Sequence, residues 1–299
     1  ITAMPTPKLD PAFVSYLREE PKISYVQPDD PWLTRQVVSS IERLFGRNHI
    51  ESIYKDLKLG PFDIATFFAE AFTNTRIERR YAGADLGAIP ANGPLVFVAN
   101  HPFGIVDGMA LCDMALQARG DFRILIHSLL CQDKDLAPYF LPIDFNPTKQ
   151  AIKNNIRVKN ATQDCLEQNI PILIFPSGFV STADKKGFGH VVDAPWTTFA
   201  AKLIRDAEAS VVPVYFPGRN RRAFHLVSHI AEPLRMALML SEARNRFGKP
   251  LDAVVGDTLC WASLNQFDNR QALTDYLYSE VQALAFHNVE PHPAVFSQR

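Results

Sequence analysis

The segment LVFVANHPFGIVDG, residues 95–108, joins a short apolar run to a polar loop and to the start of a helical pattern. Its first five residues are all apolar, include β-branched and aromatic side chains, and follow a Gly-Pro break. Such a run is typical of a strand that is buried on both faces. Helical spacing of apolar residues then continues to about residue 118. A buried strand that leads into a helix is the repeating unit of an α/β sheet protein.

The same alternation of apolar runs and helical patterns continues along the chain. Further apolar runs, each bounded by turn residues, occupy residues 124–126, 171–175 and 211–216, and helical patterns occupy residues 148–168 and 195–208. The alternation predicts an α/β fold with a mixed, largely parallel sheet that is flanked by helices on both faces.

Residues 1–80 precede this pattern and differ from it. Residues 1–30 are rich in proline and charge, which predicts an arm. A helix is expected after the Asp-Asp-Pro signal at residues 29–31, and a second helix after the Gly-Pro pair at residues 60–61. We therefore predict an N-terminal arm and helical portion over residues 1–80, and an α/β domain over residues 81–299.

The composition is that of an ordinary globular protein, since 47% of the 299 residues are hydrophobic and 21% are charged. The formal net charge is -1, so no general electrostatic attraction to nucleic acid is expected. No apolar run approaches the roughly 18–20 residues that span a bilayer, and residues 1–10 lack the apolar stretch of a signal peptide. The four cysteines form no Cys-x-x-Cys pair, which favours a reduced, cytoplasmic compartment.

Two polar residues in the loop after the first apolar run are candidates for catalysis. His101 and Asp107 lie beyond the carboxyl end of the expected strand, where ligands bind in open α/β sheets. Histidine can take up a proton near neutral pH, and a carboxylate bonded to its other ring nitrogen fixes the tautomer and stabilises the cation. General-base catalysis of this kind accelerates a reaction by roughly 100- to 10,000-fold. The alternative is structural, with His101 ending the strand and Asp107 capping the next helix.

A second candidate segment follows the apolar run at residues 171–175. Phe175, Pro176, Ser177 and Gly178 permit a tight turn whose backbone N–H groups can face an anion. Ser177 is not part of a Gly-x-Ser-x-Gly elbow, which argues against a hydrolase nucleophile. The alternative is a simple turn that joins a strand to a loop.

Two groups of basic residues complete the candidate binding residues: Arg219, Arg221 and Arg222 after the last apolar run, and Lys149, Lys153 and Arg157 in the helical pattern at residues 148–168. Arginine suits phosphate because its planar group forms two parallel hydrogen bonds. The i, i+4, i+8 spacing of the second group places its three side chains on one helix face. For each group the alternative is a solvated surface without a ligand.

Three segments, taken together and in this order, resemble the lysophospholipid and glycerol-phosphate acyltransferase superfamily. They are NHPFGIVDG at residues 100–108, IFPSGFVS at residues 174–181 and VVPVYFPGRN at residues 211–220. The longer segment PWTTFAAKLIRDAEASVVPVYFPGRN, residues 195–220, is similar to the bacterial branch labelled as hemolysins, some members of which act in ornithine-lipid synthesis. The resemblance extends over roughly residues 30–260.

The resemblance implies an acyltransferase in which His101 is the general base and Asp107 holds and polarises it. The implied reaction moves a fatty acyl group from the thioester of acyl carrier protein or coenzyme A to a lysolipid or amino-lipid acceptor. It requires no metal and no cofactor beyond the acyl thioester co-substrate. An amphiphilic acceptor implies peripheral contact with the inner membrane from the cytoplasm. The candidate contacts are the apolar, arginine-rich residues 219–246, which alternatively form a core helix with a polar rim, and the Phe-rich residues 62–72.

The chain departs from the superfamily pattern at two positions. The usual spacing is His-x4-Asp, whereas His101 and Asp107 are separated by five residues. Gly104 can absorb the extra residue, because glycine tolerates unusual backbone angles. Ser177 stands where the superfamily usually has glutamate. The loss of that carboxylate favours an amino-lipid or another unusual acceptor over a phosphate-sugar acceptor.

Two other functions fit the same residues. A non-catalytic lipid-binding protein would keep the fold while the His-Asp pair no longer worked, and a lipid esterase or thioesterase would use water as the acceptor. Acyl transfer and release of free fatty acid, measured side by side, distinguish these possibilities.

Overall fold

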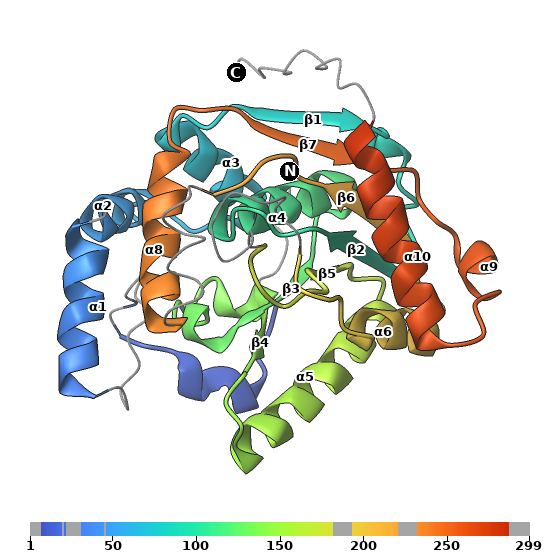
Figure 1. Cartoon of the computed structure of the whole chain (residues 1–299), viewed down its shortest axis with the longest axis horizontal. Coiled ribbons are helices and arrows are strands. Elements are labelled where there is room, and N and C mark those ends of the chain that lie inside the picture. The colour runs from blue at the N-terminus through green and yellow to red at the C-terminus, as the bar shows by residue number, and fades with distance from the viewer. Residues whose placement is uncertain are drawn as a thin grey trace.

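The structure, a computed structural model, describes residues 7–19, 21, 31–44, 46–181, 193–220 and 232–286. Within these residues, seven strands form one sheet in the order β1-β7-β6-β2-β5-β3-β4 (Figure 1). The strands are β1 (Arg79–Gly83), β2 (Leu95–Ala99), β3 (Arg123–His127), β4 (Phe140–Ile143), β5 (Ile172–Ile174), β6 (Ser210–Tyr215) and β7 (Leu251–Val255). Every neighbouring pair is parallel except β6 and β7, which are antiparallel. The predicted mixed, largely parallel sheet is therefore confirmed.

Helices cover both faces of this sheet. The helices that the structure describes are α1 (Trp32–Leu44), α2 (Arg47–Leu57), α3 (Ile64–Thr75), α4 (Ile105–Arg119), α5 (Lys149–Glu167), α6 (Phe199–Ala207), α8 (Glu232–Asn245), α9 (Trp261–Leu264) and α10 (Arg270–Ala283). Side chains of α3 and α4 belong to the hydrophobic cluster on one face. Side chains of α5, α6 and α10 belong to the cluster on the other face.

The first apolar run forms β2, which lies in the interior of the sheet with β6 on one side and β5 on the other. Successive side chains of a strand point to opposite faces. Phe97 and Ala99 accordingly pack in the cluster with α3 and α4, and Val96 and Val98 pack in the opposite cluster. All four are fully buried. Burial on both faces explains why this strand is apolar at every position.

Several elements that the sequence did not predict are polar or short. The edge strands β1 and β4 have sequences RRYAG and FLPI, in which arginines or a proline interrupt the apolar pattern. Proline is tolerated in β4 because an edge strand leaves some backbone groups without a strand partner. The helix α2 was missed because its sequence, RNHIESIYKDL, is largely polar. The strand β7 and the helix α10 lie beyond the predicted alternation.

The Phe-rich residues 62–72, considered above as a membrane contact, lie mostly inside the protein. Ile64, Phe67, Phe68 and Phe72 form the buried face of α3 and are packed with α4 in one cluster. That interpretation of the segment as a bilayer contact is therefore wrong, because its apolar face already has a protein partner.

The other proposed membrane segment, residues 219–246, is only partly within the described residues. Leu240 on α8 is fully buried and packs with Val180 and Met239, as a core helix would. Residues 221–231 lie outside the described residues. None of the described helices is long and apolar enough to cross a bilayer.

Candidate active site

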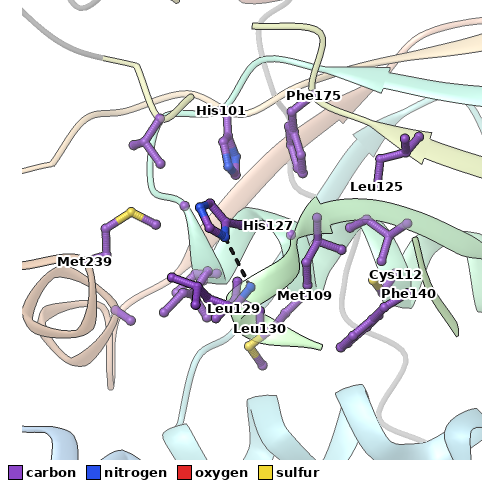
Figure 2. Close-up of a pocket in the computed structure, with 18 of the residues that line it drawn as sticks. His101, Met109, Cys112, Leu125, His127, Leu129, Leu130, Phe140, Phe175 and Met239 are labelled. Carbon is purple, nitrogen blue, oxygen red and sulfur yellow. Dashed lines mark hydrogen bonds between the residues drawn. The ribbon is translucent and has the colours of Figure 1, made fainter. Parts of the chain in front are cut away.

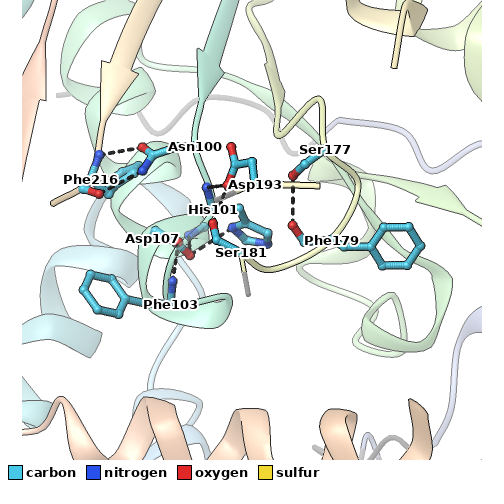
Figure 3. Close-up of polar contacts among 10 residues, drawn as sticks. Asn100, His101, Phe103, Asp107, Ser177, Phe179, Ser181, Asp193 and Phe216 are labelled. Atoms are coloured by element: carbon cyan, nitrogen blue, oxygen red, sulfur yellow. Dashed lines mark hydrogen bonds and ion pairs between the residues drawn. The ribbon is translucent and has the colours of Figure 1, made fainter. Parts of the chain in front are cut away.

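His101 lies just beyond the carboxyl end of β2, and Asp107 lies in the first turn of α4. The Nδ1 atom of His101 is 3.2 Å from Oδ1 of Asp107 (Figure 3). The Asp107 carboxylate is fully buried, and it accepts backbone hydrogen bonds from the N–H of Phe103 at 2.9 Å and of Gly108 at 3.0 Å. These bonds hold the carboxylate in place before any substrate binds.

The segment between His101 and Asp107 has an unusual backbone conformation at Gly104, where the sequence predicted one. This residue precedes the first residue of α4 and has φ 88° and ψ -99°, a conformation that L-residues rarely adopt. The alternative interpretation of Asp107 as the N-cap is wrong, because the N-cap position belongs to Gly104. Asp107 instead reaches back along the loop to Phe103, so the helix begins with its carboxylate turned toward His101.

Replacing Gly104 by alanine is expected to destabilise the protein by roughly 1–3 kcal/mol and to misplace Asp107. The added Cβ would lie 3.0 Å from Cε of Met239 and 3.1 Å from Cγ2 of Val180, in addition to the backbone strain. Gly108→Ala is the matched control, because it lies one turn further along α4 with open space at its Cβ. Thermal unfolding of both variants tests this, and equal Tm values would contradict the role given to Gly104.

The imidazole of His101 is stacked on the ring of Phe175, with 3.8 Å between ring centroids and 22° between ring planes. Its Nδ1 forms no well-aligned hydrogen bond with Asp107 despite the short distance between the two atoms. Such contacts often tighten only when substrate is bound. With Nδ1 beside the carboxylate, Nε2 is the ring nitrogen that is left to meet a substrate.

The segment Phe175–Gly178 forms a tight turn beside His101. Gly178 has φ 68° and donates its N–H to the carbonyl of Phe175 at 2.9 Å. The Ser177 hydroxyl donates to the carbonyl of Phe179 at 2.8 Å. Pro176 accepts from the N–H of Thr197 at 3.0 Å. The hydroxyl of Ser177 and the N–H of Gly178 are therefore both hydrogen-bonded within this segment.

A largely apolar cavity of about 600 Å³ opens beside His101. Figure 2 shows His101 and Phe175 on one side of it and Cys112 and Phe140 further along. Phe175, Pro176, Ser177 and Gly178 all line it. A cavity of this size and character suits an elongated apolar ligand, and His101 supplies a titratable group within it.

The sequence model of the acyltransferase family matches residues 42–249, which is more than half of the chain. The chain belongs to this acyltransferase family. It is 27% identical to a lyso-glycine lipid O-acyltransferase of Phocaeicola vulgatus over 246 residues, covering 79% of this chain and 82% of that protein. It is 25% identical to a lyso-glycine lipid O-acyltransferase of Bacteroides thetaiotaomicron over 264 residues, covering 85% and 91%.

Among solved structures, the chain is similar to the 1-acyl-sn-glycerophosphate (LPA) acyltransferase PlsC of Thermotoga maritima. The TM-score is 0.49 at 13% identity, and the match covers 85% of this chain and 95% of that one.

Two polar residues that the sequence did not single out hold the site of this acyltransferase together. Asp193 accepts the backbone N–H of His101 at 3.3 Å and the indole N–H of Trp196 at 2.9 Å, and it also bonds the hydroxyl of Ser181 (Figure 3). Asn100 forms two hydrogen bonds with the backbone of Phe216, at 2.7 and 2.9 Å. These contacts join segments far apart in sequence, so no local spacing could have revealed them.

A second histidine, His127, also lines the cavity of the acyltransferase and was not predicted (Figure 2). It is the last residue of β3, and its Nδ1 accepts the N–H of Leu129 at 3.2 Å. This bond favours the tautomer with its proton on Nε2. Its position at the carboxyl end of a strand is the signal by which the sequence could have revealed it.

Two other titratable groups that line the cavity are unsuited to nucleophilic attack. Burial, together with the nearby charge of Asp113, raises the pKa of the Cys112 thiol well above its usual value. Burial and the hydrogen bond to Asp133 likewise raise the pKa of Tyr54. Both groups therefore stay protonated and unreactive near neutral pH.

The predicted basic residues that the structure describes are exposed and do not line the cavity. Arg219 lies on the loop after β6. This loop closely approaches the His101 loop, because a Cβ atom added at the neighbouring Gly218 would lie 2.5 Å from Cζ of Phe103. Arg221 and Arg222 lie outside the described residues. Lys149, Lys153 and Arg157 lie along the exposed face of α5.

Proposed function

We propose that this acyltransferase moves a fatty acyl group from a thioester of acyl carrier protein or coenzyme A to a hydroxyl group of a lysolipid. The observation that carries the proposal is the approach of His101 to Asp107 at 3.2 Å beside a large apolar cavity. A positioned base and a volume suited to an acyl chain are the two features that this reaction needs.

In the proposed mechanism, Nε2 of His101 takes the proton of the acceptor hydroxyl. The acceptor oxygen forms a bond to the thioester carbonyl carbon, and Asp107 stabilises the imidazolium that results. The tetrahedral intermediate then collapses with cleavage of the carbon–sulfur bond. His101 returns the proton to the departing thiolate, which leaves as a free thiol. This direct attack uses no acyl-enzyme intermediate.

The N-terminus of α4 is the proposed site for the negative charge of the tetrahedral intermediate. Gly104 and Ile105 line the cavity at this end of the helix. The first backbone N–H groups of a helix have no partner within it, and the helix dipole is positive there. The Gly178 turn is the weaker of the two oxyanion candidates, because its N–H is bonded to Phe175.

We infer that the acceptor carries an amino-acid headgroup rather than a phosphate-sugar one. Ser177, whose hydroxyl is bonded within its turn, replaces the carboxylate that the superfamily usually has there. Two proteins that are similar to this chain over most of its length are lyso-glycine lipid O-acyltransferases. Arg219, exposed on the loop beside His101, is the proposed partner for a headgroup carboxylate.

The decisive experiment supplies purified protein with an acyl thioester and one acceptor at a time. We expect an O-acylated product with lyso-glycine lipid and less product with lysophosphatidate. Release of free fatty acid without an acylated lipid would indicate a thioesterase. Lipid binding without either product would indicate the non-catalytic alternative.

We further propose that the enzyme reaches its acceptor at the surface of the inner membrane from the cytoplasm. The exposed face of α1 supports a bilayer contact, because Trp32 is 67% exposed and Leu33 is 66% exposed at its first turn. Val37 lies one turn further along and is also exposed. Tryptophan is enriched at bilayer interfaces, where its ring is partly apolar and partly hydrated.

The double variant Trp32→Ala, Leu33→Ala is expected to bind vesicles at least roughly 10-fold more weakly, because each side chain loses its apolar burial in lipid. Co-sedimentation with vesicles of phosphatidylethanolamine and phosphatidylglycerol measures this. Phe286→Ala is the control, since Phe286 is exposed just after α10, across the molecule from α1 (Figure 1). Unchanged vesicle binding by the double variant would exclude α1 as the contact.

A further inference from the structure

The first turns of α5 combine exposed apolar and basic side chains. Ile152 is 59% exposed and Ile156 is 55% exposed, although isoleucine is among the residues most often buried. Lys149, Lys153 and Arg157 are exposed beside them. Within the part of the chain that the structure describes, none of these three cations forms an ion pair, whereas Lys159 further along α5 is 3.8 Å from Asp206. We call Lys149, Ile152, Lys153, Ile156 and Arg157 the α5 face.

Around the axis of α5, these side chains follow one another from the side that faces the cavity to the side that faces solvent. Successive residues of an α-helix are rotated by about 100°. On this basis Asn155 is followed around the helix by the two isoleucines, then by the two lysines, and last by Arg157. Asn155 lines the cavity. The apolar part of the α5 face therefore lies nearer the cavity, and its charges lie farther out.

The α5 face is attached to an apolar rim of the cavity. Asn155 exchanges two hydrogen bonds with the backbone of Asp144, at 2.8 and 3.0 Å, which fix α5 to the loop after β4. The next residue, Phe145, lines the cavity, and its ring lies 5.4 Å from that of Phe179. Both phenylalanines are exposed to solvent as well as to the cavity. They mark a place where a thioester-bearing arm can enter.

We propose that the α5 face docks a small acidic protein that carries the acyl group, that is, an acyl carrier protein. The inference rests on the proposed acyl transfer and selects between its two donors. A carrier protein needs both a docking surface and a nearby opening for its flexible arm, and the α5 face with the Phe145–Phe179 rim supplies both. Its three cations complement an acidic partner, although the whole chain has a net charge of only -1.

A protein partner suits the α5 face better than a bilayer does. Its apolar residues are two β-branched side chains at i and i+4, which form a narrow ridge that fits between side chains of a partner helix. The described helix that exposes an interfacial tryptophan is α1, which lies away from α5 in the fold (Figure 1). A bilayer contact is nevertheless one of the outcomes that the following experiment can detect.

The test compares three donors that bear the same acyl chain: acyl carrier protein, coenzyme A and pantetheine. For the variant Lys153→Glu, Arg157→Glu, kcat/KM with the acyl carrier protein is expected to fall roughly 10-fold or more, mainly through KM. Rates with acyl-pantetheine are expected to stay unchanged, because this donor lacks the acidic protein. Ile156→Ser provides a second variant that removes apolar contact without changing charge. Lys159→Glu on the same helix is the matched charge control.

Each other result overturns the docking proposal. An equal loss with acyl carrier protein and acyl-coenzyme A would assign the cations to the phosphates of coenzyme A. Weaker binding to phosphatidylglycerol vesicles, with unchanged rates in neutral detergent micelles, would make the α5 face a membrane contact. Unchanged rates with every donor would leave it a solvated surface. If the unmodified enzyme transferred from no donor at all, the proposed function itself would fail.

Discussion

Replacing His101 by alanine is expected to lower the rate of acyl transfer by roughly 100- to 10,000-fold while the protein stays folded. In the proposed mechanism the imidazole takes the acceptor proton, and its Nδ1 lies 3.2 Å from Oδ1 of Asp107. The side chain is 16% exposed, and it packs on one face against Phe175. The backbone contacts of the loop, through Asp193 and Ser181, do not depend on the ring.

The measurement is the initial rate with a saturating acyl thioester, together with Tm. His49→Ala is the matched control, because His49 lies exposed on α2 and does not line the cavity. Activity within about tenfold of the unmodified enzyme, in a folded His101→Ala variant, would be too small an effect for a general base. The acyl transfer would then need another base, and His127 would be the first residue to examine.

Replacing Asp107 by asparagine is expected to lower kcat by roughly 100-fold or more, with a smaller effect on KM. The neutral amide cannot stabilise the imidazolium, and its NH₂ group cannot accept one of the two backbone N–H bonds that Asp107 receives. Loss of a buried hydrogen bond of this kind costs about 1–3 kcal/mol of stability. The variant should therefore be both less stable and much less active.

Asp113→Asn separates these two effects. Asp113 is a buried carboxylate on the same helix, where it pairs with Arg79 at 2.7 Å and accepts from Tyr81 at 3.0 Å. Its loss should destabilise the protein without touching His101. If Asp113→Asn lost as much activity as Asp107→Asn at equal stability, the effect of Asp107 would be structural and the His-Asp mechanism would be unsupported.

The candidate site could be predicted in part from the sequence, because its main residues cluster in short segments. His101 and Asp107 belong to one short segment, so a single motif predicted both, and the segment follows a strand whose apolar composition marks it as buried. Phe175 was predicted as a substrate contact, and the structure places its ring against His101. Asp193 and His127 come from separate segments, and the partner of Asn100 is the distant Phe216, so only the folded sheet brings these groups together.

By itself, the sequence determined the alternation of strands and helices, because apolar periodicity and turn residues are local properties. It also places Gly104 between His101 and Asp107, and glycine readily adopts the unusual backbone angle that the structure has there. Only the tertiary structure decided that the Phe-rich helix α3 is buried rather than free to meet a bilayer, because an apolar face has the same sequence pattern whichever partner covers it. Likewise, only the folded chain joins Asn155 of α5 to the backbone of Asp144, next to the cavity-lining Phe145, because contacts between separate elements depend on how the sheet is assembled.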